Sequence, residues 1–234
     1  MGVKEAKADV RKHADPERAK GALRFFKTGE GEYGEGDRFL GLTAAHVREV
    51  ARKHRDLRLG DLTELLRSPY HEDRSVALLI LADQFRGAEE PARERIFRFY
   101  LRNTRRINGW DLVDLSADKI VGAHLDGKDA AVLHDLARSR SVWERRIAII
   151  ATFHFIRRGR FDTTLEIAEA LLGDEHDLIH KAVGWMLREV GKRDRSSEEV
   201  FLRRHCARMP RTMVRYAIEK FPEPLRQKYL KGRV

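Results

Sequence analysis

The chain has 234 residues, of which 47 are Lys or Arg and 37 are Asp or Glu, so its formal net charge at pH 7 is +10. The length is sufficient to bury a sizeable core, and the basic excess favours a polyanionic partner such as nucleic acid, although anionic membrane surfaces attract basic proteins too. Because Cys206 is the only cysteine, an intrachain disulfide and a thiolate metal cluster are excluded.

The N-terminal stretch, Met1–Asp15, is polar and charged and contains no apolar segment of a secretory signal. The longest apolar runs, Val76–Ala82 and Ile147–Ala151, are far shorter than the roughly 18 residues that indicate a membrane span. We therefore expect a soluble protein of the cytosol that has no membrane partner.

Helical patterns dominate the chain. Asp15-Pro16 pairs a good N-cap with proline at the first helical position, and Thr43 is a second expected N-cap. Residues 29–41 carry five glycines and predict a loop. About a dozen helices and no strand are expected, over residues 16–28, 43–55, 61–68, 69–85, 91–105, 109–125, 129–139, 142–157, 162–172, 177–192, 197–208, 210–220 and 223–230.

The spacing of the longer amphipathic segments predicts a repeat. They begin at Arg74, Trp110, Arg146, Lys181 and Arg211, with separations of 36, 36, 35 and 30 residues, and each follows a shorter helix. A period in the mid-thirties made of paired helices is typical of tandem helical repeats, which stack into a curved array with a concave binding surface. No compositional break divides the chain, so a single domain over residues 1–234 is expected.

The segment Asn108-Gly109-Trp110-Asp111-Leu112-Val113-Asp114 offers candidate chemistry. If Asn108 is the N-cap, Trp110 and Asp114 lie four apart on one helix face, where an aromatic ring and a negative charge can meet one small target. The alternative interpretation is a core tryptophan with a surface aspartate favoured by the helix N-terminus.

Trp185 follows two repeats later beside Gly184, and it can equally be a packing residue. His176 and His180 are four residues apart but have no third ligand, so no metal site is expected. The glycines of residues 29–36 have no preceding strand and no GK[ST] ending, so a phosphate-binding loop is not expected there.

Several segments, in family order, resemble the AlkD family of DNA glycosylases over nearly the whole chain. They are LRFFKTGEGEYGEGDRFLGL (Leu23–Leu42), LLRSPYHEDRSVALLIL (Leu65–Leu81), NGWDLVDLSADKIVG (Asn108–Gly122), WERRIAIIATFHFI (Trp143–Ile156), HDLIHKAVGWMLREVGKRD (His176–Asp194) and PRTMVRYAIEKFPE (Pro210–Glu223). The resemblance implies an all-α, right-handed HEAT-like solenoid, similar to armadillo arrays, whose basic concave face holds duplex DNA.

The resemblance also implies hydrolysis of the N-glycosidic bond of cationic N3- or N7-alkylated purines by a monomer, without metal or cofactor and without flipping the lesion into a pocket. The matching catalytic residues are Trp110, Asp114 and Trp185. The expected DNA contacts are Arg146, at the arginine place of the W-x-x-R pattern, with Phe25 and Lys181. The family's early aromatic can be tyrosine, whereas this chain has Phe25 and Phe26, so a hydroxyl contact is absent there.

The implied chemistry is physically sensible. An N3- or N7-alkylpurine carries positive charge and leaves as a neutral base, so the protein needs mainly to stabilise positive charge growing on the deoxyribose. Asp114 can do this and can orient water, and the faces of Trp110 and Trp185 favour the same charge. Two alternatives remain: a non-catalytic protein that binds unusual DNA structures, and a protein-binding helical scaffold.

Overall fold

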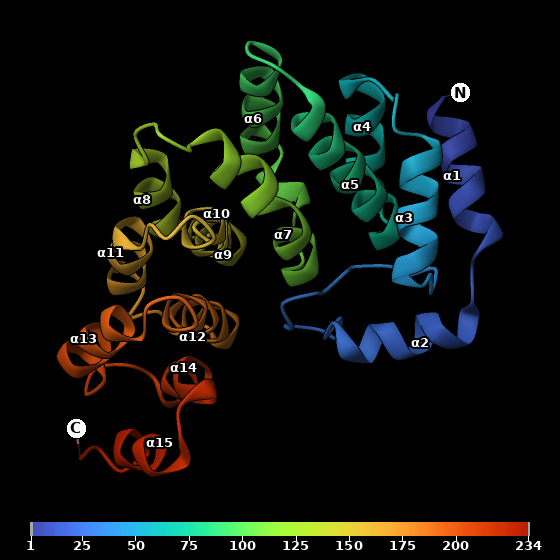
Figure 1. Cartoon of the computed structure of the whole chain (residues 1–234). Coiled ribbons are helices and arrows are strands. Elements are labelled where there is room, and N and C mark those ends of the chain that lie inside the picture. The colour runs from blue at the N-terminus through green and yellow to red at the C-terminus, as the bar shows by residue number, and fades with distance from the viewer. Residues whose placement is uncertain (1, 234) are drawn as a thin grey trace. The chain divides into compact units, whose positions relative to one another are not determined.

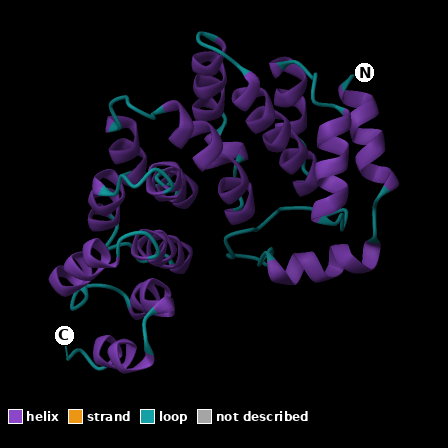
Figure 2. Ribbon diagram, viewed as in Figure 1, coloured by secondary structure: helices purple, strands orange, loops and turns teal. Residues whose placement is uncertain are grey.

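The computed structural model describes residues 2–233 and confirms an all-helical chain (Figures 1 and 2). Within those residues no strand occurs, and Arg38 and Tyr70 form one isolated parallel bridge. No helix in this range combines the length and the apolar character that crossing a membrane requires.

Contacts divide the chain into two compact units, with the boundary after Ile120. The first unit contains α1 (Val3–Lys12), α2 (Pro16–Phe25), α3 (Ala44–Lys53), α4 (Leu59–Leu66), α5 (His71–Gly87), α6 (Ala92–Arg102), the 3₁₀ turn η1 (Thr104–Arg106) and α7 (Trp110–Ala117). A π-helical turn, η2 (Asp118–Gly122), spans the boundary. The second unit contains α8 (Ala131–Ala137), α9 (Val142–Ala151), α10 (Phe153–Ile156), α11 (Asp162–Ala170), α12 (Asp177–Gly191), α13 (Arg195–His205), α14 (Arg211–Ala217), the 3₁₀ turn η3 (Ile218–Lys220) and α15 (Glu223–Leu230).

The capping predictions have mixed outcomes. The Asp15 side chain accepts the backbone N–H groups of Glu17 and Arg18, and the Thr43 hydroxyl accepts that of His46, so both expected caps are confirmed. The expected N-cap at Asn108 is wrong by one residue. Gly109 occupies that position, where a Cβ atom would lie 3.1 Å from Cε1 of His71, so a larger residue would crowd the imidazole.

Helix pairing within each unit confirms the predicted helical repeat. In the first unit α5 packs against α3, α4 and α7 and is buried on nearly every side. In the second unit α12 packs between α9 and α14, with the shorter α8, α11 and α13 beside them (Figure 1). Gly184 permits a close contact between α12 and α14, because a Cβ atom there would lie 2.5 Å from the carbonyl oxygen of Met213.

Two further points concern the predicted extent of the fold. Helix α1 was not among the expected segments, and it packs against α3 and α4 through the fully buried Ala6 and Val10. The single domain over residues 1–234, together with the right-handed curvature and the basic concave face, stays a prediction.

Candidate functional site

Helix α7 presents Trp110 and Asp114 one turn apart, and both side chains are half-buried. Residues four apart lie on the same helix face, so the ring and the carboxylate share one surface, as expected. The Asp114 charge also acts on the interior. Burial, followed by the charges of Asp118 and Asp114, holds the pKa of Tyr100 above its ordinary value, so this phenol stays neutral and bonds to the Ser116 hydroxyl at 2.9 Å.

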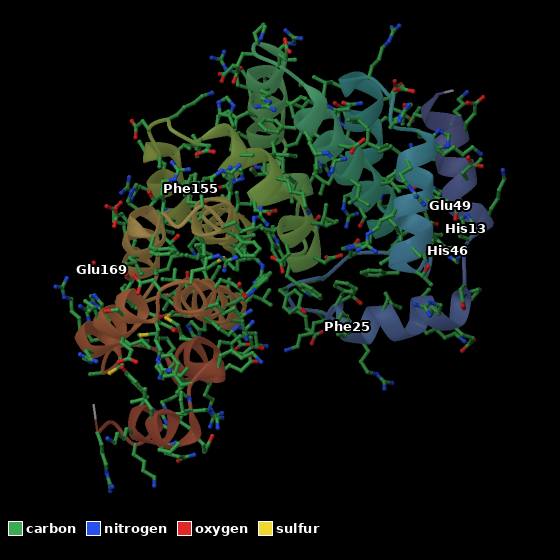
Figure 3. The ribbon with its side chains drawn as sticks, viewed as in Figure 1. His13, Phe25, His46, Glu49, Phe155 and Glu169 are labelled. Carbon is green, nitrogen blue, oxygen red and sulfur yellow. The ribbon has the colours of Figure 1, made fainter. Side chains whose placement is uncertain are left out.

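Aromatic rings surround the start of α7. Phe26, which follows α2, stacks on Trp110 with ring centroids 5.4 Å apart and on Phe39 at 4.8 Å. Phe39 stacks in turn on His71 at 4.7 Å. Phe25 meets Trp110 edge to face at 5.7 Å, and its side chain lies at the C-terminal end of α2 with 65% of its surface exposed (Figure 3). The indole of Trp110 therefore belongs to a continuous ring cluster.

His71, the first residue of α5, links three segments through hydrogen bonds. Its Nδ1 lies 2.8 Å from Oδ2 of Asp37 in the glycine-rich segment (residues 29–41), and its Nε2 lies 2.7 Å from Oδ2 of Asp111 on α7. The second Asp37 oxygen accepts a bond of 2.6 Å from the Arg74 guanidinium. Two cations and two carboxylates thus form a buried network of balanced charge.

The charges of this network reinforce one another. Burial disfavours the imidazolium of His71, but the hydrogen bonds to Asp111 and Asp37 outweigh burial and raise its pKa to about 9. Burial likewise opposes the Asp37 charge, while the bonds from His71 and Arg74 lower the pKa of that carboxyl. At neutral pH, His71 is therefore a cation between two anions.

The glycine-rich segment is anchored to α5 by a second buried carboxylate. Glu72 accepts the backbone N–H groups of Leu40, Gly41 and Leu42 at 2.8 to 3.3 Å. Gly41 has a φ of +84°, and a Cβ atom there would lie 2.1 Å from the Asp15 carbonyl oxygen, so glycine is required. The glycine-rich segment is consequently held in one conformation against α5.

A cavity of about 410 Å³ lies between α2 and helices α3, α5 and α7, beside the glycine-rich segment. Its lining combines apolar side chains, among them Phe26, Phe39, Leu79 and Leu115, with the charged side chains of Arg18, Arg48, His71, Glu72 and Asp111. Leu79 was expected in the core of its helix, yet it is only partly buried, because it faces this cavity.

Trp185 lies in the second unit, half-buried in the middle of α12. Its Nε1–H donates to Oε1 of Glu189 at 3.3 Å, and its ring tilts against that of Phe153 at 6.0 Å. The Arg157 guanidinium lies 4.5 Å from the Phe153 centroid. The surroundings of Trp185 are therefore aromatic and cationic.

The two expected basic DNA contacts of the second unit differ in exposure. Arg146 on α9 is only 5% exposed, and its Nη1 donates to the Leu178 carbonyl of α12 at 2.7 Å, so it joins two helices. Lys181 is half-buried and forms an ion pair of 2.7 Å with Asp177 one turn earlier. Contact of either side chain with DNA stays a prediction.

The structure brings together Trp110, Asp114 and Phe25 in the first unit, and it places Trp185, Arg146 and Lys181 on α12 and α9 of the second. The convergence of the two groups stays a prediction. No arrangement of three or more His, Cys, Asp or Glu side chains suited to a metal ion occurs among residues 2–233.

The network around His71 was not predicted. The partners of His71 lie 34 and 40 residues away in the chain, and no local spacing connects them. One signal was available: Asp111 is a second carboxylate in the Trp110–Asp114 segment, and an aspartate flanked by apolar residues at a helix start needs a partner when it is partly buried.

Comparison with known proteins agrees with the fold. A solved structure described as a predicted DNA alkylation repair enzyme from Enterococcus faecalis superposes with a TM-score of 0.67 at 16% sequence identity, covering 90% of this chain and 98% of that one. No curated protein matches the sequence significantly. The sequence profile described as DNA alkylation repair enzyme matches residues 6–221, and since that span is nearly the whole chain, the protein belongs to the DNA alkylation repair enzyme family.

Proposed function

We propose that this protein is a monofunctional DNA glycosylase that hydrolyses the N-glycosidic bond of N3- or N7-alkylated purines in duplex DNA. Family membership supplies the setting of DNA alkylation repair. The observation that carries the reaction class is the pairing of Trp110 and Asp114 on one half-buried face of α7, where an electron-rich ring stands beside a carboxylate.

The chemistry needs little from the protein beyond this pairing. The bond from C1′ of the deoxyribose to the purine nitrogen breaks, its electrons neutralise the cationic base, and positive charge develops on the sugar. Asp114 stabilises that charge and orients a water molecule, which adds to C1′ and loses a proton to the solvent. The products are a free alkylpurine and an abasic site.

The remaining assigned residues stabilise charge or bind DNA. The rings of Trp110 and Trp185 favour a cationic sugar by cation–π attraction. Phe25 offers a largely exposed aromatic surface, and Arg146 and Lys181 neutralise phosphates, which agrees with the net charge of +10. We propose that the protein acts as a monomer and without a cofactor.

Incubation with duplex DNA treated with a methylating agent tests the proposal, with untreated duplex as the control. Mass spectrometry of the supernatant is expected to detect free 3-methyladenine and 7-methylguanine, in amounts matching the abasic sites formed. Repair without base release contradicts hydrolysis. Duplex binding without any repair supports the non-catalytic DNA-binding alternative, and absence of both supports the protein-binding scaffold.

A further inference from the structure

We propose that His71 is a positioning residue for this reaction: held between Asp37 of the glycine-rich segment and Asp111 of α7, it fixes the ring of Trp110. The inference rests on the proposed function where base release is measured. The orientation of the Trp110 ring rests on the geometry of the first unit alone.

The first connection between His71 and Trp110 runs through hydrogen bonds. Neutral imidazole has one N–H group, yet both nitrogens of His71 lie within 2.8 Å of a carboxylate oxygen. Both nitrogens therefore donate, and the ring is held in one orientation from either side. Asp111 immediately follows Trp110, so the bond from His71 fixes the first turn of α7 that carries the indole.

The second connection runs through stacked rings. The order of the stack is His71, Phe39, Phe26 and Trp110, with successive centroids 4.7, 4.8 and 5.4 Å apart and interplanar angles of 22°, 19° and 19°. Rings that stack in this way restrict one another's tilt. An imidazole locked at one end of the stack therefore restricts the indole at the other.

Gly109 shows how closely this arrangement is fitted. A Cβ atom at that position would lie 3.0 Å from Oδ1 of Asp111 and 3.1 Å from Cε1 of His71. Oδ1 of Asp111 is buried with no hydrogen-bond partner among the described residues, so His71 is the partner on which this carboxylate depends. Removing the imidazolium leaves Asp111, and with it the first turn of α7, without this anchor.

His54 provides a matched control within the same unit. It is also a buried histidine, 2% exposed, and its Nε2 lies 2.8 Å from Oδ2 of Asp9. That pair joins α1 to the C-terminal end of α3, away from the ring stack. A purely structural role predicts the same behaviour for His71 and His54 variants, whereas a positioning role predicts different behaviour.

The experiment compares His71→Gln with His54→Gln in single-turnover release of 7-methylguanine, with each rate referred to the folded fraction. His71→Gln is expected to slow release at least tenfold, with duplex affinity within about threefold of the unmodified protein, because small misplacements of a reacting group reduce rates by up to about 10²-fold. His54→Gln is expected to stay within about twofold. Release by folded His71→Gln within twofold of the unmodified protein overturns the proposal.

A spectroscopic measurement separates this proposal from the proposed function. Trp110→Phe identifies the near-ultraviolet circular dichroism band of the stacked indole. His71→Gln is expected to lose that band and His54→Gln to keep it. If the unmodified protein releases no base, the proposed function fails, and the band alone then decides whether His71 orients Trp110. A band that His71→Gln leaves unchanged overturns the positioning role.

The unmodified chain supplies a test that needs no variant to fold. The charged groups facing His71 are Asp37, Asp111 and Arg74, and the His71 pKa is about 9. The Trp110 band is expected to weaken as the pH rises from 7 to 10 while the helical signal persists. A band constant over that range overturns the proposal.

Discussion

Two helices of this protein carry a tryptophan followed four residues later by an acidic side chain, in very different surroundings. On α12, the Glu189 carboxylate accepts bonds from Trp185, from Lys192 at 2.5 Å and from Arg193 at 3.2 Å. On α7, Asp114 lies half-buried with Asp118 also contributing negative charge nearby. The same local pattern therefore occurs in both units, and Asp114 is the candidate catalytic carboxylate of the two.

The two tryptophans differ in how they are held. Trp110 is the first residue of its helix and belongs to a ring stack. The stack ends at His71, whose two ring nitrogens each form a hydrogen bond. Trp185 lies in mid-helix, where the adjacent Gly184 brings α12 against α14 and a single hydrogen bond to Glu189 orients the indole. A stack of rings from other segments orients the first ring, while a hydrogen bond one turn away and one tilted ring, Phe153, orient the second.

Neutralising the acid of each pair gives the largest expected difference between them. Asp114→Asn is expected to slow single-turnover release of 7-methylguanine by roughly 10²–10³-fold, or about 2.7–4 kcal/mol of transition-state stabilisation, the usual effect of losing one preorganised electrostatic group. Affinity for undamaged duplex should stay level or rise, because a carboxylate repels phosphates.

Glu189→Gln is the matched control for that measurement. The Glu189 carboxylate forms ion pairs with Lys192 and Arg193, so we expect its substitution to lower folding stability. The release rate is expected to stay within about threefold of the unmodified protein. Near-normal release by Asp114→Asn would remove Asp114 from the mechanism, and equal losses in both variants would assign a structural role to both carboxylates.

The sequence was sufficient to predict the helices whose signals are local. Asp15 and Thr43 form their caps with backbone groups two or three residues away, and such contacts depend on spacing alone. Helix α1 gave a weaker signal, because only Ala6, Asp9 and Val10 of its ten residues are buried and the rest are largely charged. Its burial depends on α3 and α4, which no local pattern shows.

In the candidate site, likewise, the local contacts were predictable and the long-range contacts were not. Trp110 and Asp114 share a helix face because of their spacing, and that prediction needs only the helix. The contacts of His71 with Asp37 and Asp111 needed the packing of the glycine-rich segment against α5, in which Glu72 binds three successive backbone N–H groups. Glutamates and glycines at that point in the sequence predicted only a loop.

Titration of one buried group in each unit extends the comparison, and its expected effect on the free energy of unfolding is smaller than the effect of Asp114→Asn on the rate. The folded pKa of His71, about 9, exceeds the ordinary 6.5, so its stabilisation is fully present below pH 6.5 and is lost as the pH rises through 9. One pKa unit corresponds to about 1.4 kcal/mol. We therefore expect deprotonation of His71 between pH 7 and 10 to lower the free energy of unfolding by roughly 2–3 kcal/mol.

Glu198 of the second unit provides the contrast. Burial raises its pKa to about 8, so its contribution declines as the pH rises from 4.5 through 8. Urea unfolding at pH 7, 8, 9 and 10 is expected to show a shallower pH dependence for His71→Gln, and Glu198→Gln is expected to keep the decline near pH 9. The His71 assignment is wrong if His71→Gln and the unmodified protein have parallel profiles.

The smallest expected effect separates two basic side chains of the second unit. Arg146→Ala and Lys181→Ala are each expected to reduce the slope of log affinity against log salt concentration by about one, since each is proposed to neutralise one phosphate. Arg146→Ala should also lower stability, because its guanidinium joins α9 to the Leu178 carbonyl. Fluorescence anisotropy of labelled duplex over a salt series measures the slopes, and a slope unchanged by either substitution removes that residue from the DNA contacts.

The buried ionic link from Asp37 through His71 to Asp111 also restricts how this protein can diverge. Its three members come from separate segments, and the loss of any one of them unbalances the charge of a largely buried network. Substitutions at these positions are therefore expected to covary: a relative with an uncharged residue at the His71 position should lack at least one of the two aspartates. A chimera that takes residues 29–41 from such a relative should fold only when α5 and α7 come from the same parent.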